Sequence, residues 1–241
     1  MTEERKREIR DNYNRVCEKI ESAKARRNCG SGPVRLLAAT KTVAPEEILY
    51  AVEELGLQLV GENKVQELLS KYDSLKGACP LHFIGHLQTN KVRQIIGKVD
   101  MIHSVDSVRL AEEIGKRSSA QGIVTDVLIE VNIGMEEAKG GIMPDRVQEF
   151  ADSLGCIEGI RLRGLMTMAP VCANSDEYRK YFNKTYGIYL DISENKSHNI
   201  IEPVLSMGMS DSYEAAILEG SGLVRVGSAI FGRRAYPEKQ A

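Results

Sequence analysis

The feature that most constrains the fold is a repeated alternation of short apolar runs with amphipathic helical patterns. We predict strands at the apolar runs 34–40, 57–61, 81–86, 101–105, 125–132, 160–167, 203–207 and 223–227. Helical patterns separate them at 45–55, 63–76, 88–98, 107–119, 144–154, 174–191 and 211–219. Because most of these strands are apolar throughout, they predict a parallel sheet whose outer face is covered by the helices.

Eight strands of this kind predict a single (β/α)8 barrel. A length of 241 residues is normal for such a barrel, whereas an open doubly wound sheet more often stops at about five to seven strands. We expect one domain over 1–241, with a helix in 1–28 packed on a barrel formed by 34–233. Few residues follow the eighth strand, so this extra N-terminal helix should cover part of the outer wall.

Lys41 stands where the first apolar strand stops, in the stretch "LLAATKT". Catalytic and binding side chains of such barrels collect at the carboxyl ends of the strands. Apolar surroundings would disfavour the ammonium form of a lysine there, and a neutral amine is the form that condenses with an aldehyde. The plainer interpretation is a lysine that extends its amine to solvent or caps strand carbonyls.

A second constellation follows the last two strands. Ser206, Gly208 and Ser210 follow the seventh strand, and Gly227 and Ser228 end the eighth. Barrels commonly build a phosphate site at this place from backbone N–H groups, hydroxyls and a short helix. Each loop alone is also explained by a tight turn with a helix cap. Beside a strand-end lysine, the two loops together favour a ligand that carries both a phosphate and an aldehyde, such as pyridoxal 5′-phosphate.

Arg225 lies inside the last apolar strand, where its charge must be paired or face a ligand. It either bridges to a carboxylate such as Glu62 or Glu130, or donates to the pyridine nitrogen of the same cofactor. An arginine does not readily give up its proton, so the ring nitrogen would remain unprotonated. Such a ring is a poor electron sink, which weighs against chemistry through a carbanion.

Several other residues are weaker candidates. Asn63 follows the second strand and either caps the next helix or lies beside the ligand. His82 and His86 are about 13 Å apart if both lie on one strand, too far to share a metal ion, so we predict no metal site. His86 remains a candidate for the edge of the site, as do Met166 and Met207, whose simpler interpretation is core packing.

Composition argues against several classes of partner. The 32 basic and 34 acidic residues give a net charge of −2, without the basic excess that nucleic-acid binding requires. No window approaches the roughly 18 apolar residues of a membrane span, and the start lacks a signal-peptide pattern. The five scattered cysteines fit reduced thiols. We therefore expect a cytoplasmic protein with neither nucleic acid nor a membrane as partner.

Six motifs in order resemble the pyridoxal phosphate homeostasis protein family: "LLAATKT", "GENKVQE", "HFIGHLQTNK", "GLMTM", "LSMGMSDSYEAA" and "VRVGSAIFG". The resemblance implies a barrel related to the N-terminal barrel of alanine racemase, with pyridoxal 5′-phosphate held as an internal aldimine. On this basis Lys41 matches the aldimine lysine and Arg225 the arginine that faces the pyridine nitrogen. Ser206, Gly227 and Ser228 match the phosphate site, and Asn63, His86, Met166 and Met207 match pocket-lining positions.

The resemblance also implies a function. It indicates a non-catalytic, monomeric protein that binds pyridoxal 5′-phosphate reversibly and acts in its intracellular homeostasis, with apo-enzymes as recipients. One alternative is an amino-acid racemase, which needs a proton donor on each face of the cofactor; the family of alanine racemase takes its second base from an additional domain that is not visible here. Another is a lyase that forms a Schiff base with a sugar phosphate.

Overall fold

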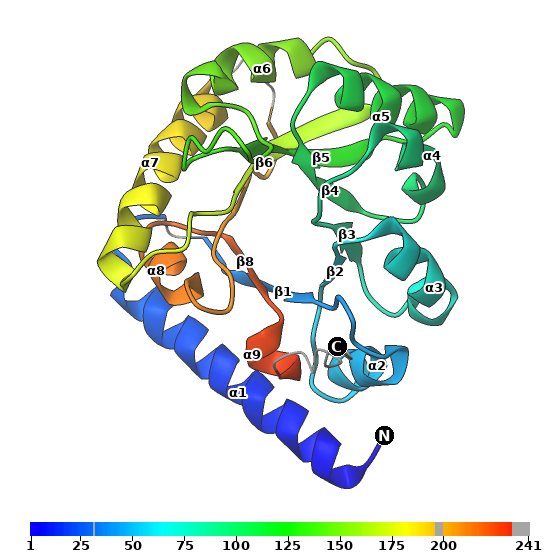
Figure 1. The fold of residues 1–241 in the computed structure, drawn as a ribbon, viewed down its shortest axis with the longest axis vertical. Helices are drawn as coiled ribbons and strands as arrows, with labels where there is room; N and C mark the ends of the chain where they lie inside the picture. Colours follow the sequence, from blue (N-terminus) through cyan, green and yellow to red (C-terminus); the bar gives the residue numbers. More distant parts are fainter. Residues whose placement is uncertain (31, 196–199, 233–241) are drawn as a thin grey trace, which may run out of the picture.

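Eight parallel strands form a closed ring in the described parts of this computed structural model, which are residues 1–30, 32–195 and 200–232. The strands are β1 (Arg35–Ala39), β2 (Val60–Glu62), β3 (Leu81–Phe83), β4 (Met101–Val105), β5 (Thr125–Val131), β6 (Ile160–Thr167), β7 (Val204–Ser206) and β8 (Leu223–Val226). Each pairs with its sequence neighbour, and β1 also pairs with β8, so the sheet has no free edge. The predicted (β/α)8 barrel is confirmed (Figure 1).

Helices surround this ring. They are α1 (Glu3–Arg26), α2 (Pro45–Glu53), α3 (Val65–Leu75), α4 (Val92–Ile95), α5 (Val108–Ala120), α6 (Val147–Leu154), α7 (Ser175–Glu194), α8 (Tyr213–Leu218) and α9 (Ser228–Phe231). Short 3-10 turns, η1 (Thr89–Lys91) and η2 (Pro144–Arg146), precede α4 and α6. Among the described helices, none is long and apolar enough to cross a membrane.

The N-terminal helix completes the outer wall. Helix α1 contacts α8 and α9 on one side and α2 on the other, so it fills the place that a long eighth helix would take (Figure 1). Its buried stripe consists of Ile9, Val16, Ile20 and Ala23, at helical spacing. The Thr2 hydroxyl accepts a hydrogen bond from the backbone N–H of Arg5 and caps the first turn.

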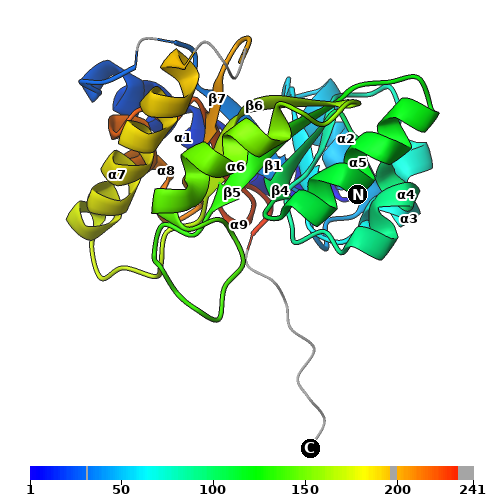
Figure 2. The ribbon, with the colours of Figure 1, turned by 90° about the horizontal axis from the view of Figure 1, so that it is seen from above.

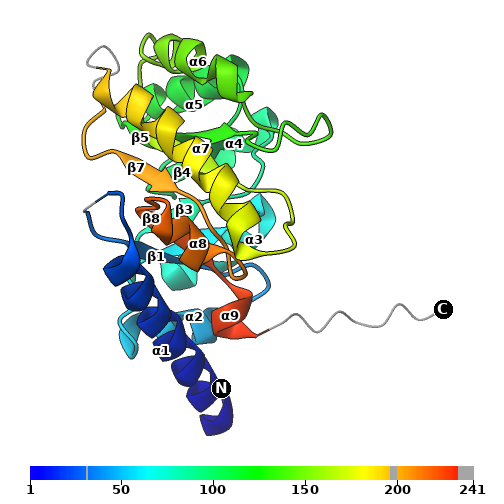
Figure 3. The ribbon, with the colours of Figure 1, turned by 90° about the vertical axis from the view of Figure 1, so that its left-hand side faces the viewer.

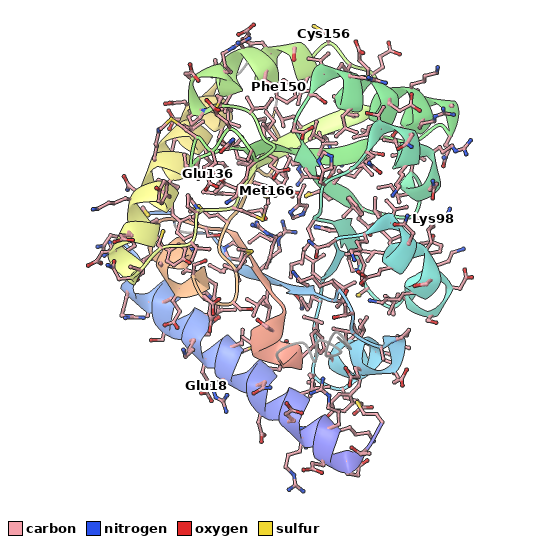
Figure 4. All side chains as sticks on the ribbon, in the orientation of Figure 1. Glu18, Lys98, Glu136, Phe150, Cys156 and Met166 are labelled. Carbon is pink, nitrogen blue, oxygen red and sulfur yellow. The ribbon has the colours of Figure 1, made fainter. Side chains whose placement is uncertain are left out.

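Apolar side chains form two cores, one outside the ring of strands and one within it. The larger core lies between the strands and the helices. The inner core contains Leu37, Leu59, Ile84, Met101, Leu128, Met166, Val204 and Leu223. Figure 4 shows Met166 in the middle of the ring, whereas Glu18 lies on the outer side of α1.

Two predicted strand boundaries differ from the structure by more than one residue. We predicted a strand at 57–61, but β2 begins at Val60, because the chain leaves α2 through Gly56 at a φ of +77° and the Leu57 N–H bonds back to Ala51. The strand predicted at 81–86 ends at Phe83. There a Cβ on Gly85 would lie only 2.1 Å from the Asn63 carbonyl oxygen, so the chain passes too close to its neighbour to continue the ladder. The predicted barrel boundary at 233 lies outside the described residues.

The packing of α1 gives a prediction about stability. Ile20 is 4% exposed in the core between α1 and the barrel. Replacing Ile20 with alanine should lower the free energy of unfolding by about 2–5 kcal/mol, because it removes buried methyl groups and leaves a cavity. Urea unfolding measures the change. Glu18→Ala, on the outer side of α1, is the control and should change the free energy of unfolding by less than about 0.5 kcal/mol. Equal changes in the two variants would show that the packing of α1 does not stabilise the protein.

Candidate functional site

A cavity of about 890 Å³ lies where strands β1, β2 and β8 end. Loops at this end of the barrel, after β5 and before α7, extend on the same side as α9 (Figures 2 and 3). Five predicted site residues line the cavity: Lys41, Asn63, Arg225, Gly227 and Ser228. The other four, His86, Met166, Ser206 and Met207, are not among its lining residues.

Lys41 reaches the cavity because β1 ends two residues earlier, at Ala39. The intervening Thr40 is fully buried, and its hydroxyl lies 2.7 Å from Oε1 of Glu62. Lys41 itself is partly exposed and lines the cavity together with Lys64. The structure therefore brings two primary amines to one cavity, of which Lys41 is attached to the end of a barrel strand.

Backbone N–H groups at the start of the short helix α9 donate to a serine that lines the same cavity. The N–H groups of Gly227 and Ala229 point at the hydroxyl oxygen of Ser210, at 3.3 and 3.4 Å. Ser228, the first residue of α9, is exposed beside them. A Cβ on Gly227 would lie 2.8 Å from the Ala39 carbonyl oxygen, so only glycine lets the chain pass this close to β1. N–H groups and hydroxyls gathered in this way suit an anion such as a phosphate.

Of Ser206 and Ser210, only Ser210 lines the cavity. We predicted Ser206 for the phosphate, but its hydroxyl is fully buried inside the barrel, where Arg225 donates to it at 2.6 Å. Ser210 lies four residues further along, beyond the end of β7, and lines the cavity. Ser206 is the last residue of β7 and Ser210 lies in the loop after it, a difference that only the structure shows.

Arg225 forms the inner end of the cavity. Its guanidinium is buried and donates to the Ser206 hydroxyl and, at 2.8 Å, to the Thr167 carbonyl. Burial lowers the pKa of Arg225 to about 10, while the charge of Glu130 raises it. Arg225 therefore keeps its proton at neutral pH. The predicted bridge to Glu62 is wrong, because Glu62 pairs with Lys71 at 2.8 Å.

A buried hydrogen-bonded chain continues from Arg225 through the barrel interior. Ser206 lies 3.1 Å from Nδ1 of His103, and Nε2 of His103 lies 2.8 Å from Nδ1 of His82. Because arginine can only donate, we assign the Ser206 proton to His103 and the Nε2 proton of His103 to His82. Burial lowers the pKa of His82 to about 3 and that of His103 well below its usual value. Both rings are therefore neutral at pH 7.

Asn63 has a buried side-chain oxygen that a ligand in the cavity could satisfy. It lines the cavity, and its Oδ1 is buried without a hydrogen-bond partner among the described residues. Its predicted alternative role, the cap of the next helix, is wrong, because the N-cap of α3 is Lys64 and no side chain caps it. A buried amide oxygen without a partner is costly unless a ligand or water satisfies it.

The remaining predicted residues lie elsewhere. Met207 is fully buried in the core between strands and helices, and Met166 belongs to the core inside the ring. His86 is exposed, with Nδ1 3.7 Å from a carboxylate oxygen of Asp106. The structure therefore does not bring these three side chains to the cavity. In the described ranges, no group of three or more histidine, cysteine, aspartate or glutamate side chains could hold a metal ion.

Comparison with known proteins finds relatives over nearly the whole chain. Residues 8–235 match the family described as alanine racemase, N-terminal domain. A protein of Aquifex aeolicus named pyridoxal phosphate homeostasis protein is 43% identical, over 94% of this chain and 98% of that protein.

Two solved structures resemble the chain closely. An unknown protein from Bifidobacterium adolescentis has 38% identity and a TM-score of 0.86, over 96% of this chain and 97% of that chain. PipY of Synechococcus elongatus PCC7942, solved with pyridoxal 5′-phosphate bound, has 27% identity and a TM-score of 0.76, over 90% of this chain and 100% of that one.

The buried histidines predict a loss of stability in acid. The unfolded state takes up a proton on His82 below about pH 6.5, whereas the folded state resists protonation down to about pH 3. The unfolded state therefore binds more protons between these values, and the free energy of unfolding should fall by about 1.4 kcal/mol per pH unit for this group. The stability that depends on a neutral His82 is fully present above pH 6.5 and is lost as the pH falls toward 3.

Urea unfolding between pH 6.5 and 4.5 measures this slope. His82→Gln keeps an acceptor for the His103 N–H but cannot take up a proton in this range. The slope of this variant should be smaller than that of the wild type by about 1.4 kcal/mol per pH unit. Identical slopes would contradict the assignment of a neutral, buried His82.

Proposed function

Because this chain belongs to the pyridoxal phosphate homeostasis protein family, we propose that it binds pyridoxal 5′-phosphate reversibly and acts in the homeostasis of that cofactor without using it for catalysis. One observation carries the proposal: the amine of Lys41, the donors at the start of α9 and the guanidinium of Arg225 border a single cavity. Pyridoxal 5′-phosphate supplies an aldehyde that condenses reversibly with a primary amine.

Each part of the cavity has a distinct role in this proposal. Lys41 provides the amine that binds the aldehyde carbon. The N–H groups of Gly227 and Ala229, with the hydroxyls of Ser210 and Ser228, bind the phosphate, since this is where the described cavity gathers backbone donors. These assignments keep Gly227 and Ser228 from the sequence analysis and use Ser210 in place of Ser206.

Arg225 would donate to the pyridine nitrogen. It keeps its proton at neutral pH, and its bonds to Ser206 and Thr167 fix the orientation of the guanidinium. A ring nitrogen that accepts from arginine stays unprotonated and withdraws electrons poorly. The residue at this position therefore favours storage of the cofactor over reactions that pass through a carbanion.

The lining residues also argue against a racemase. Racemisation by two bases needs a proton donor on each face of the substrate carbon. Among the described residues that line the cavity, there is no tyrosine, histidine or cysteine. Lys64 is the second amine there, but it is largely exposed and lies 3.7 Å from a carboxylate oxygen of Glu67. These features support a protein that carries the cofactor rather than one that turns over an amino acid.

The remaining parts of the proposal concern the oligomeric state, the cellular location and the partner enzymes. We propose that the protein binds the cofactor as a monomer. We propose a cytoplasmic protein whose recipients are apo-enzymes that require pyridoxal 5′-phosphate. Reversible condensation lets such a protein both store and release the cofactor, since water can reverse the reaction.

Replacement of Lys41 tests the proposal directly. The wild type mixed with pyridoxal 5′-phosphate should turn yellow, and borohydride should fix the cofactor on Lys41, as read by visible absorption and peptide mass mapping. Lys41→Ala should lose the fixed adduct almost completely, because no other amine is attached to the end of β1. Lys64→Ala, which removes the other amine of the same cavity, is the matched control and should keep it. An adduct that persists in Lys41→Ala would assign the covalent bond to another lysine.

Replacement of the two serines tests the phosphate assignment. Ser210→Ala and Ser228→Ala should each weaken the binding of pyridoxal 5′-phosphate about tenfold, because a hydrogen bond to a charged group contributes about 1.5–3 kcal/mol. Titration followed by absorbance measures the affinity. Ser153→Ala on α6, whose hydroxyl donates to the Phe150 carbonyl, should leave the affinity unchanged. Unchanged affinity in both cavity variants would place the phosphate elsewhere.

A further inference from the structure

The turn that carries Lys41 is held at both of its peptide groups by side chains of α3. The carbonyl of Thr40, in the peptide group before Lys41, accepts a hydrogen bond from Nζ of Lys71 at 2.7 Å. The N–H of Thr42, in the peptide group after Lys41, donates to Oε2 of Glu67 at 2.8 Å. The two side chains are one helical turn apart, with Nζ of Lys71 3.9 Å from Oε2 of Glu67.

The conformation of this turn is an unusual one. Thr42 has a φ of +64°, in the left-handed region that β-branched residues rarely adopt. Such a conformation costs on the order of 1–3 kcal/mol and persists only where the surrounding structure enforces it. The hydroxyl of Thr42 donates to the Lys41 carbonyl at 2.6 Å, and its N–H is directed to Glu67. These contacts favour the strained turn over a relaxed one.

The contact between Lys71 and the Thr40 carbonyl is buried. The side chain of Lys71 is 8% exposed and pairs at 2.8 Å with Glu62, which is fully buried. The same oxygen of Glu62 accepts from the Thr40 hydroxyl at 2.7 Å. Buried charges persist only when paired, so Lys71 cannot swing away from the Thr40 carbonyl without leaving Glu62 unpaired. Helix α3 thereby fixes the end of β1 as well as that of β2.

We propose that Glu67 and Lys71 are positioning residues for Lys41: together they form an α3 clamp that holds the backbone of Lys41 in the orientation that aims its amine into the cavity. This inference rests on the proposed function, because it assigns the clamp to the reaction of Lys41 with an aldehyde. Neither clamp residue touches the reacting atoms. They act through the two peptide groups of Lys41.

The reaction that benefits is a condensation without a change in oxidation state. The neutral amine of Lys41 attacks the aldehyde carbon, a carbon–nitrogen bond forms, and the carbonyl oxygen leaves as water after taking up two protons from the nitrogen. Hydrolysis reverses each change. Because the clamp restricts where Nζ can lie before the attack, its loss should slow the condensation, and misplacement by about 1 Å can cost up to about a hundredfold.

Glu67 is the better position for a test. Its side chain is 23% exposed, so its replacement leaves no buried charge unpaired, whereas replacing Lys71 would strand Glu62. In Glu67→Ala we expect the rate of condensation with pyridoxal 5′-phosphate, followed by visible absorption, to fall about tenfold. Glu67→Gln still offers an oxygen to the Thr42 N–H and should restore the rate to within about twofold. Asp73→Ala, an exposed acid on the same helix, is the matched control.

A second ligand separates positioning from general damage. Pyridoxine 5′-phosphate has the ring and the phosphate but no aldehyde, so its affinity reports on the cavity without the covalent bond. The proposal expects Glu67→Ala to bind it with wild-type affinity. Equal rates in Glu67→Ala and wild type would overturn the clamp, as would a parallel loss of affinity for both ligands. A wild type that binds neither ligand would instead refute the proposed function.

Discussion

A guanidinium inside the barrel is the constraint on which the rest of the interior depends. Burying the charge of Arg225 is costly unless each donor finds an acceptor. The interior therefore supplies the Ser206 hydroxyl and the Thr167 carbonyl, and beyond them two neutral histidines replace apolar side chains in the ring of strands. Arg225 also lines the cavity. One charge thus organises both the polar centre of the barrel and the inner end of the site.

The fold could be predicted from the sequence because the patterns that indicate its strands and helices are local. Continuous apolar runs mark the strands, and helical spacing in the first segment placed α1 against the barrel, as observed. The sequence also singled out Lys41 and Arg225, which line the cavity, since a cation at a strand end or inside a strand stands out against apolar neighbours. It left Met207 either in the core or at the pocket, although alternation along β7 favours the core. Val204 and Ser206 face the barrel interior, so Met207, at odd spacing from both, packs outward.

Other features depend on contacts that no local pattern contains. His82 and His103 are 21 residues apart, and their pairing follows only from the register of β3 with β4. In the sequence, Glu67 and Lys71 look like an ordinary pair on an exposed helix face. The structure gives them another role, because the turn after β1 lies over that face and uses both side chains. Ser210 was visible in the sequence, but its distance from α9 was not.

Helix α1 fills the wall beside the last elements of the chain, and this has a consequence during synthesis. Arg5 donates to the carbonyl of Phe231, a contact between residues 226 positions apart. Because α1 is translated long before α8 and α9, the part of its apolar stripe that packs against them stays uncovered until they have been made. Closure of the barrel through β8 and β1 is subject to the same delay. The nascent chain should accordingly depend on chaperones for longer than a protein whose early helices pack on their immediate neighbours.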